Sequence, residues 1–227
     1  MRITHLLLPV SDPAAASRFY RDTLQLPVEE GQVHIGWSRI TLQQAEGPAP
    51  GGVHLAFNVP DDRFAAAIDW LRARVALQSN DRGETHFKLE SSWESQSIYF
   101  AGPDDAILEL IGRRRLPSSA RTGPFHGSEM TCLSEVGLCT EDVPAMQHSL
   151  AVQYGLTPLS PASDVFAPMG DDEGLLILVR NDRRWFPEQR QLPDVRGLRV
   201  QVQDVRGDGG DVGDAQQDWA VTAGALR

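Results

Sequence analysis

Three residues on separate segments of the chain could bind one metal ion together. His5, His54 and Glu109 each lie in a short apolar run that is typical of a β-strand. Glu109 stands between Ile107 and Ile111 on one face, where a carboxylate is costly to bury unless a cation or strong donors compensate. Two neutral imidazoles and one carboxylate form a facial triad, which suits Fe(II), Mn(II), Ni(II) or Zn(II) and leaves coordination positions open for a substrate. We therefore expect one divalent metal ion on this set.

The segments that carry the two histidines repeat one another. In three places a β-like run ends at an aspartate, and a helical pattern follows Asp12, Asp61 and Asp142. An aspartate there is a typical N-cap, because its carboxylate accepts the free N–H groups of the first helical turn. His5 and His54 occupy the same position of successive repeats, so a pseudo-twofold arrangement would bring them to equivalent sites facing each other. Taken singly, each histidine also fits an ordinary hydrogen-bonded position.

Strand pairs follow the helical patterns, so the repeating unit is strand–helix–strand–strand. The predicted pairs lie within residues 32–43, 97–111 and 164–179, and a further strand is expected at 197–203 without a helix after it. A segment rich in Gly, Pro, Ser and Arg at 114–131 is typical of a linker. We expect a complete domain of two units at 1–113 and an abbreviated second domain at 132–227.

Composition and charge narrow the function classes. The chain has 227 residues, of which 41% are hydrophobic and 23% charged, which is typical of a folded soluble protein. Its net charge of −10 argues against nucleic acid or an anionic membrane as a partner, and its apolar runs are too short to span a bilayer. Cys132 and Cys139 are expected to be free thiols in a reducing cytoplasm. These features favour a cytoplasmic protein with a small-molecule partner.

Three motifs together resemble a known superfamily. They are His-x-x-Leu-x-Val-x-Asp from His5, His-x-Ala-Phe-x-Val from His54, and Tyr-Phe-x-x-Pro-Asp-x-x-x-Leu-Glu-Leu at residues 99–110. In this order and at this spacing they are similar to the vicinal oxygen chelate superfamily, which includes glyoxalase I, bleomycin-resistance proteins and extradiol dioxygenases. The resemblance covers residues 1–113 well and 133–204 more faintly.

The resemblance implies an α+β fold and a metal site. Paired βαβββ units form curled mixed β-sheets, which make an open cup around a metal with the helices outside. Position by position, the metal ligands fall on His5, His54 and Glu109. In the second half Glu135 stands in place of the first histidine. We therefore expect at most one metal, in the N-terminal half, with the other half structural or shaping the cleft.

The resemblance leaves two functions open. The first is a metal-dependent enzyme, a lyase or isomerase of the glyoxalase type or an extradiol-type dioxygenase, acting on a small molecule that chelates the metal through adjacent oxygens. The position of the fourth glyoxalase I ligand falls at or near Thr41, where this sequence has no carboxylate. The position of the extra histidine of extradiol dioxygenases falls in residues 90–92, Glu-Ser-Ser, which contain no histidine. The alternative is a non-catalytic binding protein, like the bleomycin-resistance relatives, which needs no metal.

Further residues are expected around the site. Tyr99 is the expected catalytic hydrogen-bond donor, although a strand aromatic that packs the sheet is the more ordinary interpretation. Residues expected to line the substrate cleft are His34, Trp37, Lys88 and Trp93. Because members of this fold often complete their cups with a partner chain, either a homodimer forms here or the two halves complete each other internally.

Overall fold

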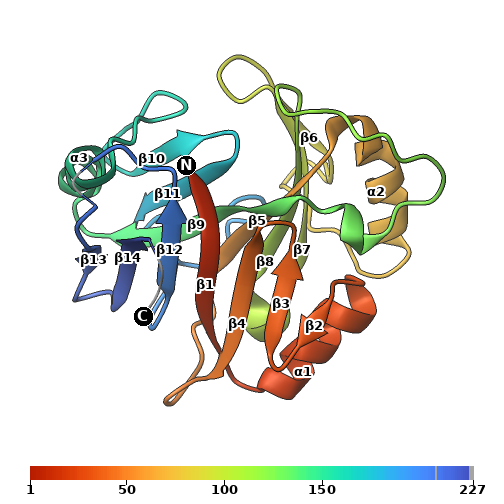
Figure 1. Ribbon diagram of the computed structural model, residues 1–227, viewed down its shortest axis with the longest axis horizontal. Coiled ribbons are helices and arrows are strands. Elements are labelled where there is room, and N and C mark those ends of the chain that lie inside the picture. The colour runs from red at the N-terminus through yellow and green to blue at the C-terminus, as the bar shows by residue number, and fades with distance from the viewer. Residues whose placement is uncertain (208, 225–227) are drawn as a thin grey trace.

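The described residues form two curled seven-stranded sheets with three α-helices at their periphery (Figure 1). This computed structural model describes residues 1–207 and 209–224, so residues 208 and 225–227 of the expected second domain lie outside the described residues. The architecture is the mixed α+β fold with repeated strand–helix–strand units that the motifs predicted. In the described part of the chain, no helix is long and apolar enough to cross a membrane.

The first sheet has the strand order β13-β14-β12-β1-β4-β3-β2. Its strands are β1 (Arg2–Val10), β2 (Val28–Glu29), β3 (Gln32–Ile35), β4 (Ser38–Gln44), β12 (Arg199–Gln203), β13 (Val212–Asp214) and β14 (Trp219–Ala223).

The second sheet has the order β10-β11-β9-β5-β8-β7-β6. Its strands are β5 (His54–Val59), β6 (Phe87–Leu89), β7 (Ser95–Ala101), β8 (Ile107–Arg113), β9 (Cys132–Thr140), β10 (Phe166–Asp171) and β11 (Gly174–Arg180). The strand pairs predicted from the sequence are present in both sheets.

Each sheet is assembled from two repeating units that come from opposite halves of the chain. Within a unit the first strand pairs in parallel with a later strand, as in β1–β4, β5–β8, β9–β11 and β12–β14. Between units the joints are antiparallel, β1 with β12 and β5 with β9. The first sheet therefore joins the first unit to the fourth, and the second sheet joins the second unit to the third. Of the two arrangements left open above, the two halves complete each other internally.

The units share one strand register, which places equivalent residues at equivalent points. In β1–β4, Leu7 lies opposite Thr41, two residues after His5. In β5–β8, Ala56 lies opposite Glu109, again two residues after the histidine that opens the unit. Thr41 is thus the positional counterpart of Glu109.

Three α-helices begin where the strands end, at α1 (Pro13–Arg18), α2 (Phe64–Arg72) and α3 (Val143–Tyr154). The predicted N-caps of α1 and α3 are confirmed: Asp12 accepts from the Ala15 amide and Asp142 from the Ala145 amide, each at 2.9 Å. Asp61 is not an N-cap. It begins a 3-10 turn, and its carboxylate accepts a hydrogen bond from the Gln96 side chain at 2.7 Å.

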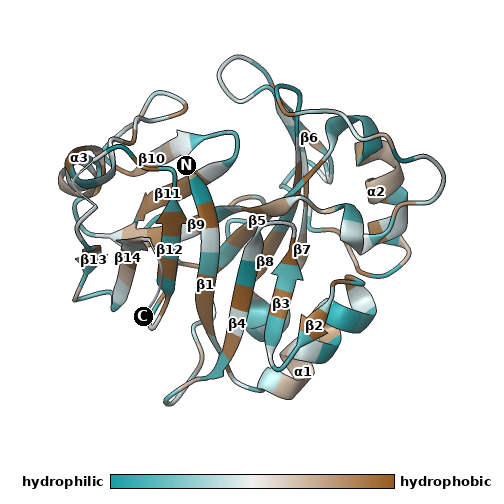
Figure 2. Cartoon of the chain, viewed as in Figure 1, coloured by the Kyte–Doolittle hydropathy of each residue, from teal (hydrophilic) through white to brown (hydrophobic). Residues whose placement is uncertain are grey.

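The hydrophobic core lies between the sheets and under the helices. In β1 the buried Leu6, Leu8 and Val10 alternate with partly exposed residues, as expected for a strand with one covered face. Every residue of β5 is buried, because both faces of this central strand are covered. In Figure 2 the hydrophobic colour is concentrated on the strands, and the peripheral loops are mostly hydrophilic.

The expected linker, residues 114–131, is fixed to the fold by a buried ion pair. The Arg63 guanidinium, next to α2, donates to Glu129 at 2.7 Å and also to the Gly123 carbonyl at 2.8 Å. The linker therefore packs against the second unit before β9 begins.

Candidate metal centre

Three buried ligand groups converge on the concave face of the second sheet. His54 opens β5, Glu109 lies in the middle of β8, and Glu135 lies in β9. Their side chains are at most 7% exposed, and each offers a ligand atom within 4.8 Å of the others. The His54 Nε2 atom lies 3.5 Å from a Glu109 oxygen and 3.6 Å from a Glu135 oxygen. We call His54, Glu109 and Glu135 the cluster.

Strand register explains why these three groups meet. Ala56 lies opposite Glu109 on one side and opposite Glu135 on the other, so the two glutamates occupy one row across three strands. Directly paired residues project from the same face of a sheet. His54 precedes Ala56 by two residues and projects from that same face. The small Ala56 side chain separates the two carboxylates.

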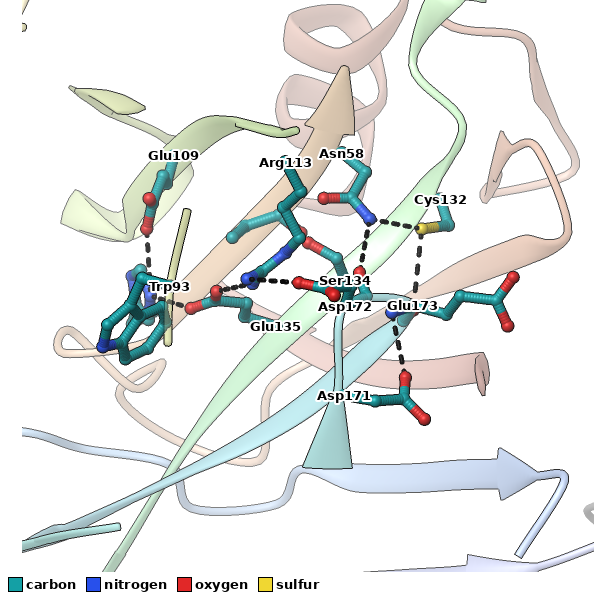
Figure 3. A network of polar contacts seen from close by, with 12 residues as sticks. Asn58, Trp93, Glu109, Arg113, Cys132, Ser134, Glu135, Asp171, Asp172 and Glu173 are labelled. Atoms are coloured by element: carbon teal, nitrogen blue, oxygen red, sulfur yellow. Dashed lines mark hydrogen bonds and ion pairs between the residues drawn. The ribbon is translucent and has the colours of Figure 1, made fainter. Parts of the chain in front are cut away.

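A buried arginine connects the cluster to the rest of the sheet, as Figure 3 shows. Arg113, at the end of β8, has no exposed side-chain surface, and its guanidinium donates a short hydrogen bond to Glu135. The same group lies 3.7 Å from an Asp172 oxygen and 5.8 Å from the centre of the Trp93 ring. One oxygen of Glu135 therefore faces Arg113 while the other faces His54.

The pKa values of the two carboxylates are shifted in opposite directions. Burial raises the pKa of Glu109 well above its usual range, and the negative charge of Glu135 raises it further. Burial also opposes ionisation of Glu135, but the His54 hydrogen bond and the charge of Arg113 outweigh it and lower the pKa of Glu135. Without a bound cation, Glu109 keeps its proton to higher pH and Glu135 is the ionised partner.

The cluster forms part of a cavity of about 510 Å³ whose lining includes six phenylalanine, tyrosine and tryptophan residues. The Phe87 ring packs edge-on against Tyr99 at 5.7 Å and against Phe186 at 4.6 Å. The Trp185 ring lies 5.1 Å from His54, and its indole N–H donates to the Gly52 carbonyl at 2.7 Å. This cavity is of the size and character of a site for a small organic molecule.

Five of the residues singled out from the sequence line this cavity. They are His54, Lys88, Trp93, Tyr99 and Glu109. Tyr99 lies directly opposite Glu109 across the β7–β8 pair, and its ring stacks over His54 at 6.3 Å. Burial, with Glu109 nearby, raises the pKa of Tyr99 well above its usual range, so the phenol remains a hydrogen-bond donor at neutral pH.

The other three lie elsewhere, on the first sheet. His5, His34 and Trp37 line a separate hollow of about 350 Å³. The His5 Nε2 atom is 2.7 Å from the Thr41 hydroxyl, which occupies the position equivalent to Glu109. The structure therefore does not bring His5 to His54 and Glu109. Glu135, from the second half of the chain, stands where His5 was expected.

The presence of Glu135 in place of the expected His5 also changes where the site lies in the chain. The sequence predicted a metal within the N-terminal half, with the second half structural or shaping the cleft. The cluster instead takes two groups from residues 1–113 and one from the second half, because β5 pairs with β9 and β1 pairs with β12. The signal for Glu135 was present in the sequence, since it aligns with His5 when the repeats are superposed. Arg113 and Trp185 carried no comparable signal.

The cluster fits a divalent metal ion. One imidazole nitrogen and two carboxylate oxygens form a donor set that suits Mn(II), Fe(II), Ni(II) or Zn(II). Burial raises the pKa of Glu109 and the charge of Glu135 raises it further, and a cation between the two carboxylates would offset both effects. The hydrogen bond from Arg113 fixes the outer oxygen of Glu135, as second-layer partners do for metal-binding carboxylates.

Comparisons with known proteins agree with this fold. Residues 2–110 match the family model of the Glyoxalase/Bleomycin resistance protein/Dioxygenase superfamily. This match covers just under half of the chain, and it is to the superfamily that the three motifs resemble. No match was found among curated proteins.

Two solved structures are similar over nearly the whole chain. A "putative dioxygenase" from Bacillus subtilis subsp. subtilis str. 168 superposes with a TM-score of 0.60 at 15% identity, covering 98% of this chain and 85% of the other. Glyoxalase I from Zea mays superposes with a TM-score of 0.58 at 14% identity, covering 98% of this chain and 91% of the other. At these identities the likeness concerns the fold.

Proposed function

We propose that this protein is a metal-dependent enzyme of the glyoxalase/dioxygenase type, acting on a small molecule that presents two adjacent oxygens. The observation that carries the proposal is the buried cluster on the floor of an aromatic cavity. His54, Glu109 and Glu135 would hold the metal and leave the cavity side free for the substrate. Bound there, a divalent cation supplies Lewis acidity, which polarises substrate oxygens and stabilises developing negative charge.

The chain's own residues would position the substrate and move its protons. The Tyr99 phenol, held protonated by burial, is placed to donate a hydrogen bond beside the cluster. A substrate bound against the aromatic residues of the lining would displace water, which strengthens polar interactions within the cavity. Arg113 keeps Glu135 ionised and oriented. Lys88 and Trp93 would contact the substrate from the cavity lining.

Metal analysis of protein purified without chelator tests this proposal. We expect about one divalent ion per chain by mass spectrometry, and we expect Glu109→Gln and Glu135→Gln to lower occupancy at least tenfold, since each removes one ligand. His5→Asn is the matched control and should retain full occupancy. Loss of metal in His5→Asn, with occupancy kept in both glutamate variants, would contradict the proposed ligand set.

The identity of the metal then separates the reaction classes. Iron supports oxygen-dependent cleavage of the extradiol type, whereas nickel or zinc supports isomerase or lyase chemistry. A homodimer, which the internally completed cups do not require, and the expected cytoplasmic location stay predictions, to be checked by sedimentation and by localisation of the tagged protein.

A specific observation also favours the second candidate, a non-catalytic binding protein. With Glu109 protonated and Glu135 paired with Arg113, the charges of the cluster balance without any added cation. A thermal-shift screen of small aromatic and dicarbonyl compounds distinguishes the two functions. A binding protein should be stabilised equally by its ligand with chelator and with metal, whereas the proposed enzyme should need the metal.

A further inference from the structure

Arg183 lines the same cavity as the cluster, and nothing in the described part of the chain neutralises it. It is half-buried, and its guanidinium forms no ion pair or hydrogen bond with another described residue. Its neighbours behave differently: Arg180 pairs with Asp182 at 2.6 Å, and the Arg184 guanidinium donates to the Arg190 carbonyl. Among these three arginines, Arg183 is therefore the one whose guanidinium has no hydrogen-bond or ion-pair partner in the described part of the chain.

An aromatic ring covers one side of the Arg183 guanidinium. Its guanidinium carbon lies 4.8 Å from the centre of the Phe166 ring, an arrangement that fixes a cation over an aromatic face. Burial lowers the pKa of Arg183, and no nearby carboxylate offsets this effect. A cation that is partly removed from water without a counter-charge costs free energy, which an anionic ligand would offset.

The carboxylates that share the cavity are already engaged. Glu109 and Glu135 face His54 on the floor. Glu84, at the exposed side, accepts a hydrogen bond from the Asn80 amide at 2.6 Å. Arg183 is therefore available to a ligand.

The remaining walls define the body of that ligand. Phe87, Tyr99 and Phe186 contact one another edge-on, with ring centres 4.6–5.7 Å apart. Such a surface favours a flat apolar group, because aromatic pairs prefer edge-to-face or offset contacts. A guanidinium recognises a carboxylate through two parallel hydrogen bonds.

We propose that the cavity binds a small aromatic carboxylate, whose ring lies against Phe87, Tyr99 and Phe186 and whose carboxylate pairs with Arg183. This inference rests on the proposed function, because it names the substrate class of the same site. It makes Arg183 a specificity-determining residue: it would distinguish an anionic substrate from its neutral analogue.

Calorimetric titration with 2-naphthoate and its neutral amide, 2-naphthamide, tests the inference. We expect the wild-type protein to bind the carboxylate at least tenfold more tightly than the amide. Arg183→Gln should abolish this preference and leave amide binding unchanged, and Arg183→Lys should keep part of it, since the charge remains but the paired donors are lost. Arg184→Gln is the matched control and should behave as wild type. Circular dichroism confirms that each variant is folded.

Three outcomes of the titration itself would overturn the inference. They are equal binding of both compounds by wild type, no binding of either, and a carboxylate preference that persists in Arg183→Gln. Metal content measured on the same samples keeps the two proposals apart. If the protein contains no metal as purified, and its carboxylate preference is lost in Arg183→Gln, the Arg183 site is supported while the metal proposal fails. A preference that depends on the metal alone leaves the metal proposal standing and overturns this one.

Discussion

Ionisation of the buried Glu109 carboxyl is unfavourable in the folded protein, so we expect the free energy of unfolding to depend on pH. Its pKa is raised in the folded protein by burial and by Glu135. As pH rises, the unfolded chain releases this proton first, so the folded state loses stability between the unfolded and folded pKa values. In the presence of chelator, we expect the urea midpoint of the wild type to be lower at about pH 8 than at about pH 5.

Glu109→Gln should remove much of that fall, because the amide resembles the protonated acid and cannot ionise. The variant is thus expected to be more stable than the wild type at about pH 8 without metal, although it binds metal poorly. Urea unfolding at both pH values with chelator present gives the comparison. If the variant is the less stable protein at the higher pH, the raised pKa is not the source of the cost.

Arg113 makes the opposite contribution, because it is the buried cation that balances Glu135. Arg113→Gln would leave that carboxylate buried without its counter-charge, and we expect a loss of about 3–5 kcal/mol in the free energy of unfolding. Arg115 is the control. It pairs with Asp172 at 2.6 Å but is about one-third exposed, so Arg115→Gln should cost no more than about 1 kcal/mol. Similar small losses in both variants would show that the cluster does not depend on Arg113.

At the scale of elements, the approach of β9 to its neighbours depends on Gly137. A Cβ atom there would lie 2.6 Å from the Trp185 ring and 3.1 Å from the His54 Cβ atom. We expect Gly137→Ala to displace both rings, to cost roughly 1–3 kcal/mol of stability and to weaken metal binding. At Gly51 a Cβ would meet nothing closer than 3.9 Å, so Gly51→Ala is the control. Unaltered unfolding and metal occupancy in Gly137→Ala would show that the Trp185 and His54 side chains can move aside without loss of stability or metal binding.

The elements themselves were largely predictable from the sequence, and the way they combine was not. Alternating apolar residues and capping aspartates are local signals, so the strand pairs within residues 32–43, 97–111 and 164–179 and the starts of α1 and α3 were predicted correctly. The short strands β2, β13 and β14 were not predicted. Which unit pairs with which is decided by β1–β12 and β5–β9, contacts between distant segments that no local pattern encodes. For that reason His54 and Glu109 were placed together correctly, while the third group was expected to be His5 and is Glu135.

At the scale of the molecule, four related units make two unequal cups. The second sheet keeps a histidine and two acids on its concave face, whereas the equivalent pair on the first sheet, His5 and Thr41, has become a neutral hydrogen bond of 2.7 Å. Burial lowers the pKa of His5, and the charge of Arg39 lowers it further. A neutral His5 with a hydroxyl partner is a weaker ligand set than the cluster, which favours metal chemistry in one cup.

Dividing the chain within the linker tests this account of the whole molecule. Fragments 1–120 and 121–227 separate Glu135 from His54 and Glu109, and separate β1 from β12. We expect neither fragment alone to bind metal with the affinity of the intact chain, and a mixture of the two to recover both metal occupancy and cooperative unfolding. Because each half exposes a strand that the other half normally covers, the isolated fragments are also expected to aggregate. Full metal binding by fragment 1–120, abolished by His5→Asn, would instead show that the first two units build a triad of His5, His54 and Glu109 by themselves.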